Sequence, residues 1–83
     1  MNHLANRLIG AQLRILRKDA NLTQQQVAER LGVPQSVISK LETGERSLFL
    51  DEVAPYSKAL GVDPDVVLER ADYALVSHAR AYR

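Results

Sequence analysis

The sequence predicts an all-α protein, and three observations support this fold class. Apolar residues recur at helical spacing along most of the chain, as Ile9, Leu13 and Leu16 do at i, i+4 and i+7. Three glycines each follow such a segment, where a residue without Cβ can adopt the positive φ that ends a helix: Gly32, Gly44 and Gly61. The 83 residues, 46% hydrophobic and 25% charged, have the composition of one folded domain.

The first helix is expected to run from Leu4 or Asn6 to Asp19. Leu8 and Ile15 lie off its apolar stripe and are either edge core or partner-facing. Its last turns carry basic residues, which suit the negative end of a helix: Arg14, Arg17 and Lys18.

The second helix is predicted to begin after Thr23 and to end at Gly32. Thr23 and Gln26 have the spacing of a capping box, in which each side chain bonds a backbone amide left free at the helix start. A narrow apolar stripe follows: Val27, Ala28 and Leu31.

The third helix, Gln35 to Leu41, is expected to begin just after Pro34, which cannot continue the preceding helix. Ile38 and Leu41 form its apolar seam, and the remaining side chains give a polar outer face: Gln35, Ser36, Val37, Ser39 and Lys40. Two short helices joined by a tight turn, the second with a polar outer face, indicate a helix-turn-helix unit of the kind used on DNA.

A loop from Thr43 to Ser47 and a fourth helix between Leu48 and Leu60 are predicted next. The apolar residues of this helix are Val53, Tyr56 and Leu60. Pro55 leaves two alternatives. If the helix begins near Leu50 or Asp51, the missing amide falls in or just after the first turn; otherwise Pro55 kinks the helix.

The fifth helix is expected to open with Asp63 as N-cap and Pro64 at the first position. Beyond it, Leu75, Ala79 and Tyr82 have the spacing of a further helical segment, which can instead fray. The predicted core is Ile9, Leu13, Leu16, Val27, Ala28, Leu31, Ile38, Leu41, Val53, Leu60 and Val66.

Several short runs of the chain resemble one known family, in order and without a gap. They are Ile9-Gly10, Leu13, Leu16-Arg17, Leu22-Thr23-Gln24, Val27-Ala28, Leu31-Gly32-Val33, Ser36, Ile38-Ser39-Lys40-Leu41-Glu42, Gly44 and Lys58-Ala59-Leu60-Gly61-Val62. The segment from Ile9 to Glu69 thus resembles the Cro/phage-repressor (XRE-like) helix-turn-helix regulators. The resemblance implies a compact five-helix, repressor-like domain over residues 1–70. Residues 71–83 then form a C-terminal helical extension and are a candidate for dimerisation.

The same resemblance implies which side chains contact bases. Gln35, Ser36 and Lys40 are expected at base edges, since a glutamine can bond N6 and N7 of adenine and a lysine can donate to O6 and N7 of guanine. Val37 touches either a thymine methyl, the favoured alternative, or the edge of the core. Ser39, on the same outer face, is a further DNA-binding candidate.

Other residues are expected to hold the DNA backbone or the fold. Gln24 clamps the backbone or braces the first base-contacting residue, and Arg17 pairs with Glu42 at the end of the recognition helix. Thr43 and Arg46 are candidates for phosphate contact, because loops at this place in the family lie along the phosphate backbone. Glu45 must either turn outward or pair with Arg46.

Charge and composition restrict the partners. Residues 1–50 hold seven Lys and Arg against four Asp and Glu, a net +3, whereas residues 51–83 hold four against six, a net −2. The absence of cysteine excludes thiolate metal sites, and no apolar run is long enough to span a bilayer, so a cytoplasmic protein is expected. His3 and His78 lack partners at metal-site or catalytic spacing, and neither an enzyme nor a cofactor is predicted.

The functional hypothesis is a sequence-specific regulator of transcription, a repressor, that binds double-stranded DNA. A homodimer is expected on a palindromic operator, because one recognition helix covers few base pairs. The alternative is an antitoxin or a protein-bridging helix-turn-helix module, whose main partner is another protein such as a toxin or the transcription machinery. The acidic second half and the tail support this alternative.

Overall fold

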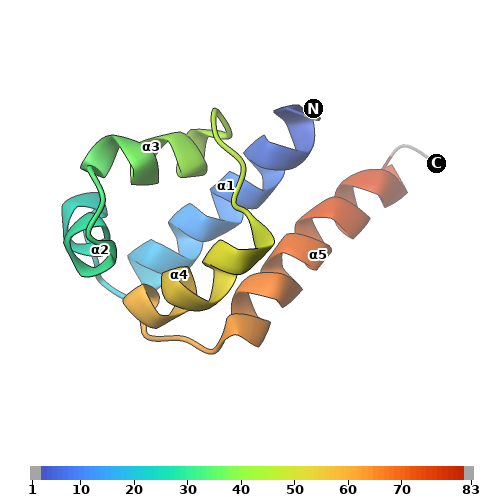
Figure 1. The fold of residues 1–83 in the computed structure, drawn as a ribbon. Helices are drawn as coiled ribbons and strands as arrows, with labels where there is room; N and C mark the ends of the chain where they lie inside the picture. Colours follow the sequence, from blue (N-terminus) through green and yellow to red (C-terminus); the bar gives the residue numbers. More distant parts are fainter. Residues whose placement is uncertain (1–2, 82–83) are drawn as a thin grey trace.

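The computed structural model describes residues 3–81 and confirms the all-α class: within these residues it has five α-helices and no strand. The helices are α1 (His3–Asp19), α2 (Gln24–Leu31), α3 (Gln35–Thr43), α4 (Val53–Leu60) and α5 (Pro64–Ala81), with one 3₁₀ turn, η1 (Leu50–Glu52), before α4. In Figure 1, α1 lies between α3 and α5 and contacts both, while α2 packs on α3 and α4. The long α1 therefore organises the molecule.

The start of α2 confirms the capping box. The Gln26 amide donates to the Thr23 hydroxyl at 3.1 Å, and the Thr23 amide donates to Gln26 Oε1 at 2.8 Å. At the other end Gly32 has φ +70°, the left-handed conformation expected of a glycine that ends a helix. These local signals therefore fix the length of α2.

The fourth helix is shorter than the predicted span. Phe49 is extended, and its amide donates to the Glu52 carboxylate at 2.9 Å, so the α-helix begins only at Val53, after η1. Pro55 is the third residue of α4, where a backbone amide has no acceptor inside the helix. The proline is therefore accommodated in the first turn, although the α-helix begins at Val53 and not near Leu50 or Asp51 as the first alternative required.

The C-terminal extension is a continuation of α5. Residues 64–81 form one helix in which Val67 and Ala74, seven residues apart, are both buried, and α5 packs along α1 (Figure 1). Ala79 lies within this helix, whereas Tyr82 is outside the described residues. Neither α5 nor any other helix within residues 3–81 is both long and apolar enough to cross a membrane.

The predicted core is correct for most of its members, and three residues differ. Ile9, Leu31 and Val66 are only half-buried at its edge, while the neighbouring Val67 is 2% exposed. Leu31 lines a pocket between α2, α3 and α4, and Val66 lines a hollow between α4 and α5, so each faces a gap between helices. The buried apolar side chains are Leu13, Leu16, Val27, Ala28, Ile38, Leu41, Val53, Tyr56, Ala59, Leu60, Val67 and Ala74.

Gly10 lets the backbones of α1 and α3 come into contact. A Cβ atom at Gly10 would lie 2.3 Å from the Leu41 carbonyl oxygen and 2.6 Å from that of Glu42. Both neighbours are backbone atoms at the end of α3, so neither can move without moving the helix. The distance between α1 and α3 thus depends on the absence of one methyl group at Gly10.

We predict that Gly10→Ala destabilises the protein. In an open helix, alanine is favoured over glycine by about 1 kcal/mol. At Gly10, overpacking of the added methyl group against α3 should outweigh this preference. The free energy of unfolding should then fall by about 1–3 kcal/mol. Chemical denaturation measures the difference, and a variant at least as stable as the parent would contradict the contact.

Candidate nucleic-acid interface

Helix α3 carries the candidate recognition surface. Ile38 and Leu41 are buried, whereas Gln35, Ser36 and Lys40 are exposed on the outer side of the helix. Within residues 3–81 the side chains of Ser36 and Lys40 make no hydrogen bond or ion pair, so their polar groups are available to a ligand. The helix therefore presents polar groups outward and apolar groups inward.

A buried ion pair attaches the end of α3 to α1. Arg17 Nε donates to Glu42 Oε2 at 2.7 Å and Nη2 donates to Oε1 at 3.0 Å, with both residues 7% exposed. The third guanidinium nitrogen, Nη1, donates to the Leu22 carbonyl at 2.8 Å. The hydrogen bond to Glu42 raises the pKa of Arg17, against the opposing effect of desolvation. The pair expected from the sequence is thus present.

Two glutamines extend this ion pair to the start of α3. Gln24 Nε2 donates to Glu42 Oε1 at 3.1 Å, and Gln35 Nε2 donates to Gln24 Oε1 at 3.3 Å. We call this series of hydrogen-bonded side chains, Arg17–Glu42–Gln24–Gln35, the polar relay. A carboxylate can only accept, so Glu42 directs the Gln24 amide nitrogen inward and its oxygen toward Gln35. Gln24 therefore braces Gln35, which retains Oε1 and one N–H for a ligand.

Val37 and Ser39 lie less favourably for DNA contact than the sequence suggested. Val37 is half-buried and packs against the core, where it lines the pocket between α2, α3 and α4. This placement favours the core edge over a thymine methyl. Ser39 is also half-buried.

Arg46, in the loop after α3, forms an ion pair within the protein. Arg46 Nη1 and Nη2 donate to Glu52 Oε1 and Oε2 at 3.0 and 2.8 Å, and the guanidinium lies 5.2 Å from the centroid of the Phe49 ring. The hydrogen bond from Arg46 lowers the pKa of Glu52. Glu45 is exposed and accepts from the Thr43 hydroxyl at 3.1 Å, so Arg46 does not pair with it. Glu52 was not among the residues expected at this site, since no local spacing links it to Arg46.

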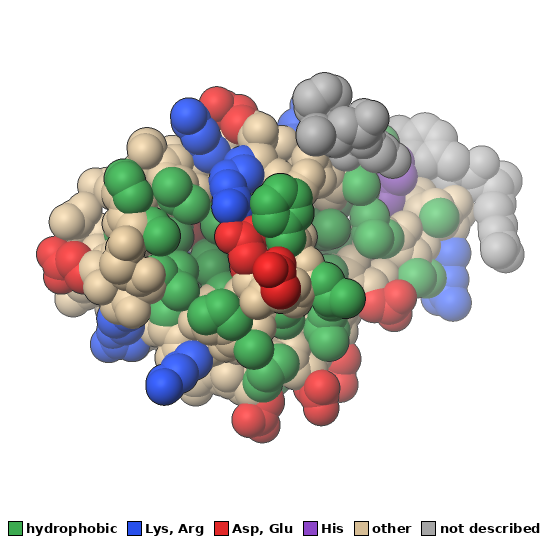
Figure 2. Space-filling view, in the orientation of Figure 1, with side chains coloured by type: hydrophobic (Ala, Val, Ile, Leu, Met, Phe, Trp, Pro, Cys, Tyr) green, Lys and Arg blue, Asp and Glu red, His purple; other side chains and the backbone are tan. Residues whose placement is uncertain are grey.

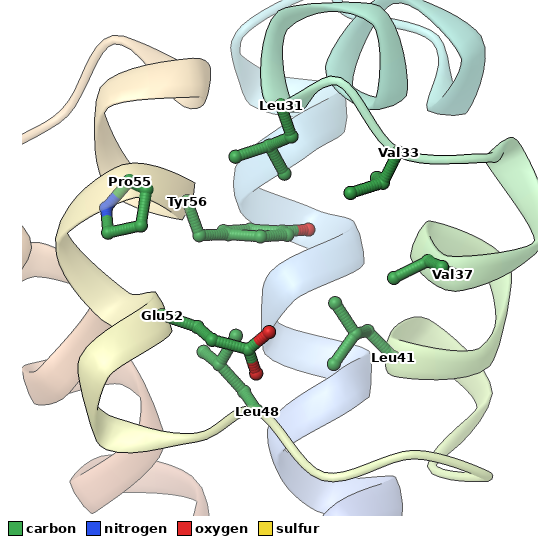
Figure 3. A pocket seen from close by; sticks show the side chains of 8 residues that line it. All are labelled: Leu31, Val33, Val37, Leu41, Leu48, Glu52, Pro55 and Tyr56. Atoms are coloured by element: carbon green, nitrogen blue, oxygen red, sulfur yellow. The ribbon is translucent and has the colours of Figure 1, made fainter.

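A small apolar pocket of about 200 Å³ lies between α2, α3 and α4 (Figure 3). Its walls are Leu31, Val33, Val37, Leu41, Leu48, Glu52, Pro55 and Tyr56. Figure 2 shows apolar side chains gathered over this face, between α2, α3 and α4. Burial raises the pKa of Tyr56 far above its usual value, and its hydroxyl has no hydrogen-bond partner within residues 3–81. Those residues also contain no group of His, Asp and Glu that could hold a metal ion.

Comparison with known proteins identifies relatives in sequence and in fold. A family model described as "Helix-turn-helix domain" matches residues 8–70. Control protein C.BamHI of Bacillus amyloliquefaciens is 35% identical over 63 residues, 75% of this chain and 78% of the relative. The clp gene regulator ClgR from C. glutamicum superposes with a TM-score of 0.75 at 31% identity, over 82% of this chain and 88% of that one. An XRE-family like protein from Pseudomonas syringae pv. tomato gives 0.67 at 36% identity, over 83% and 88%.

We predict that Arg17 and Glu42 are strongly coupled. Glu42→Leu leaves a buried guanidinium unpaired and should cost about 3–5 kcal/mol, whereas Arg17→Met with Glu42→Leu should cost less than the sum of the single changes. Chemical denaturation of the four proteins measures this coupling.

The matched control is the ion pair of Arg46 and Glu52, whose side chains are 30% and 32% exposed. Glu52→Gln should cost only about 0–1 kcal/mol. Two results would contradict a special role for the buried pair. One is an equal loss of unfolding free energy for Glu42→Leu and Glu52→Gln, and the other is additive losses for Arg17→Met and Glu42→Leu.

Proposed function

The chain belongs to the XRE-like helix-turn-helix family of DNA-binding transcriptional regulators, and from this premise we propose that it represses transcription from a palindromic operator. Two copies bind as a symmetric homodimer, and each inserts the exposed face of α3 into the major groove. In this arrangement the recognition helices enter successive major grooves, about 34 Å apart on one side of the duplex.

The observation that carries this proposal is the orientation of Gln35. The exposed Gln35 side chain donates one N–H to Gln24, and its Oε1 and second N–H have no partner within residues 3–81. An acceptor beside a donor is the pattern that complements N6 and N7 of adenine. Ser36 and Lys40, exposed on the same face, extend the contact to neighbouring base pairs.

Backbone contacts come from the end of α3 and the following loop. The Thr43 hydroxyl lies at the exposed last turn, and Arg46 follows in the loop. Arg46 reaches a phosphate by exchanging the Glu52 carboxylate for a phosphate oxygen, so its contact carries the cost of the broken pair. Gln24, half-buried, acts mainly through Gln35.

Dimerisation is supported by the distribution of exposed apolar side chains. Six large ones follow Gly44: Phe49, Leu50, Leu68, Tyr73, Leu75 and Val76. Leu50, in η1, is 81% exposed and directly follows Phe49, which is 57% exposed, so the two are neighbouring exposed apolar side chains. We therefore propose that residues 1–70 form the DNA-binding domain and that the extension, residues 71–83, adds apolar area to the dimer contact.

We predict that Gln35→Ala weakens binding by about 1–3 kcal/mol and relaxes the preference at one base pair. Arg46→Ala should instead weaken cognate and random duplexes alike. Selection of bound sequences from the DNA around the gene supplies the cognate duplex, and titrations at several salt concentrations give the affinities. Equal losses on both duplexes for Gln35→Ala would remove it as a base-contacting residue. An absence of salt-sensitive binding in the parent protein would instead favour the protein-bridging alternative.

For the dimer, we predict that sedimentation at micromolar concentration gives twice the chain mass, and that Leu50→Glu shifts the protein to the monomer. Ile15→Glu is the matched control, because Ile15 is 43% exposed on α1, before Gly44. It should leave the dimer intact. A parent protein that stays monomeric even on a duplex with two half-sites would contradict the dimer.

A further inference from the structure

We propose that Arg7, a residue that no sequence motif singled out, supplies a phosphate contact beside the end of the recognition helix. Its ligand is the DNA backbone, and the inference rests on the proposed DNA-binding function. Three observations carry it: the position of Arg7 against Gly44, its uncompensated charge, and the different state of Arg46.

Arg7 lies directly against the turn that ends α3. A Cβ atom at Gly44 would lie 2.6 Å from both the Arg7 amide nitrogen and its Cγ, so the two backbones touch. One turn further along α1, Gly10 makes the equivalent approach to Leu41 and Glu42. The N-terminal half of α1 thus runs along the end of α3 (Figure 1), and the exposed Arg7 side chain starts beside Gly44, the residue that ends α3.

The charge of Arg7 is available. Its side chain is exposed, and within residues 3–81 it has no hydrogen bond or ion pair. An arginine has a planar group of donors that fits phosphate oxygens and stays charged at any physiological pH. Lys40, also exposed and without an ion-pair partner among those residues, lies one turn before Gly44. The two cations therefore flank the exposed end of α3.

Arg46 differs from Arg7 in its electrostatic state. Its two bonds to Glu52 make a pair with no net charge, so exchanging Glu52 for a phosphate frees one carboxylate for each phosphate neutralised and releases few counterions on balance. Arg7 has no such partner and can neutralise a phosphate without first losing one. The salt dependence of binding should therefore depend more on Arg7 than on Arg46.

The test is the slope of log K against log salt concentration, measured with the full chain on one cognate duplex. Arg7→Gln should reduce the magnitude of the slope by about 0.9 for each protomer bound. Arg7→Lys keeps the charge and should retain the parent slope. Arg46→Gln should change it less than Arg7→Gln does. Arg70→Gln, which removes an exposed arginine from α5, is the control for net charge and should leave it unchanged.

Two results would overturn the inference while leaving the proposed function standing. One is salt-sensitive binding whose slope is the same for Arg7→Gln, Arg70→Gln and the parent protein. The other is a lower melting temperature for Arg7→Gln with an unchanged slope, which would make Arg7 only a cation that stabilises the C-terminal end of α3. If the parent protein binds no duplex at any salt concentration, the proposed function and the inference both fail.

Discussion

The buried ion pair between Arg17 and Glu42 is the interaction on which the recognition surface depends. Two charges removed from water are costly unless their hydrogen bonds are satisfied. Here Arg17 donates to Glu42 twice and to the Leu22 carbonyl once, and Glu42 accepts a further bond from Gln24. Since these bonds are directional, they fix α1, the start of α2 and the end of α3 relative to one another. An apolar contact of the same area would leave those helices freer to slide.

The sequence was sufficient for features decided by neighbouring residues. The capping box of Thr23 and Gln26 and the glycine that ends α2 are local, and the structure has them where they were expected. Within the candidate site, the exposed Gln35, Ser36 and Lys40 were also predictable, because helical periodicity separates them from the buried seam of α3.

Features that depend on how helices pack could not be predicted in the same way. Val66 and Val67 are equally apolar neighbours, and only the packing of α5 on α1 and α4 determines which is buried. Glu52 is linked to Arg46 across a loop whose course has no periodic signal. The packing role of Gly10 likewise requires α3 to lie across it, so the sequence match at Gly10 did not show what the residue does.

The polar relay also has a consequence for how DNA preference can change in evolution. Gln35 takes its orientation from Gln24, whose own orientation comes from the buried Glu42, so a substitution at Gln35 disturbs groups that the fold uses. Ser36 and Lys40 lie outside the relay and have no side-chain bond within residues 3–81 to lose. Under the proposed function, new base preferences should therefore arise first at those two positions. In a divergent lineage, Gln35 would change later and together with Gln24.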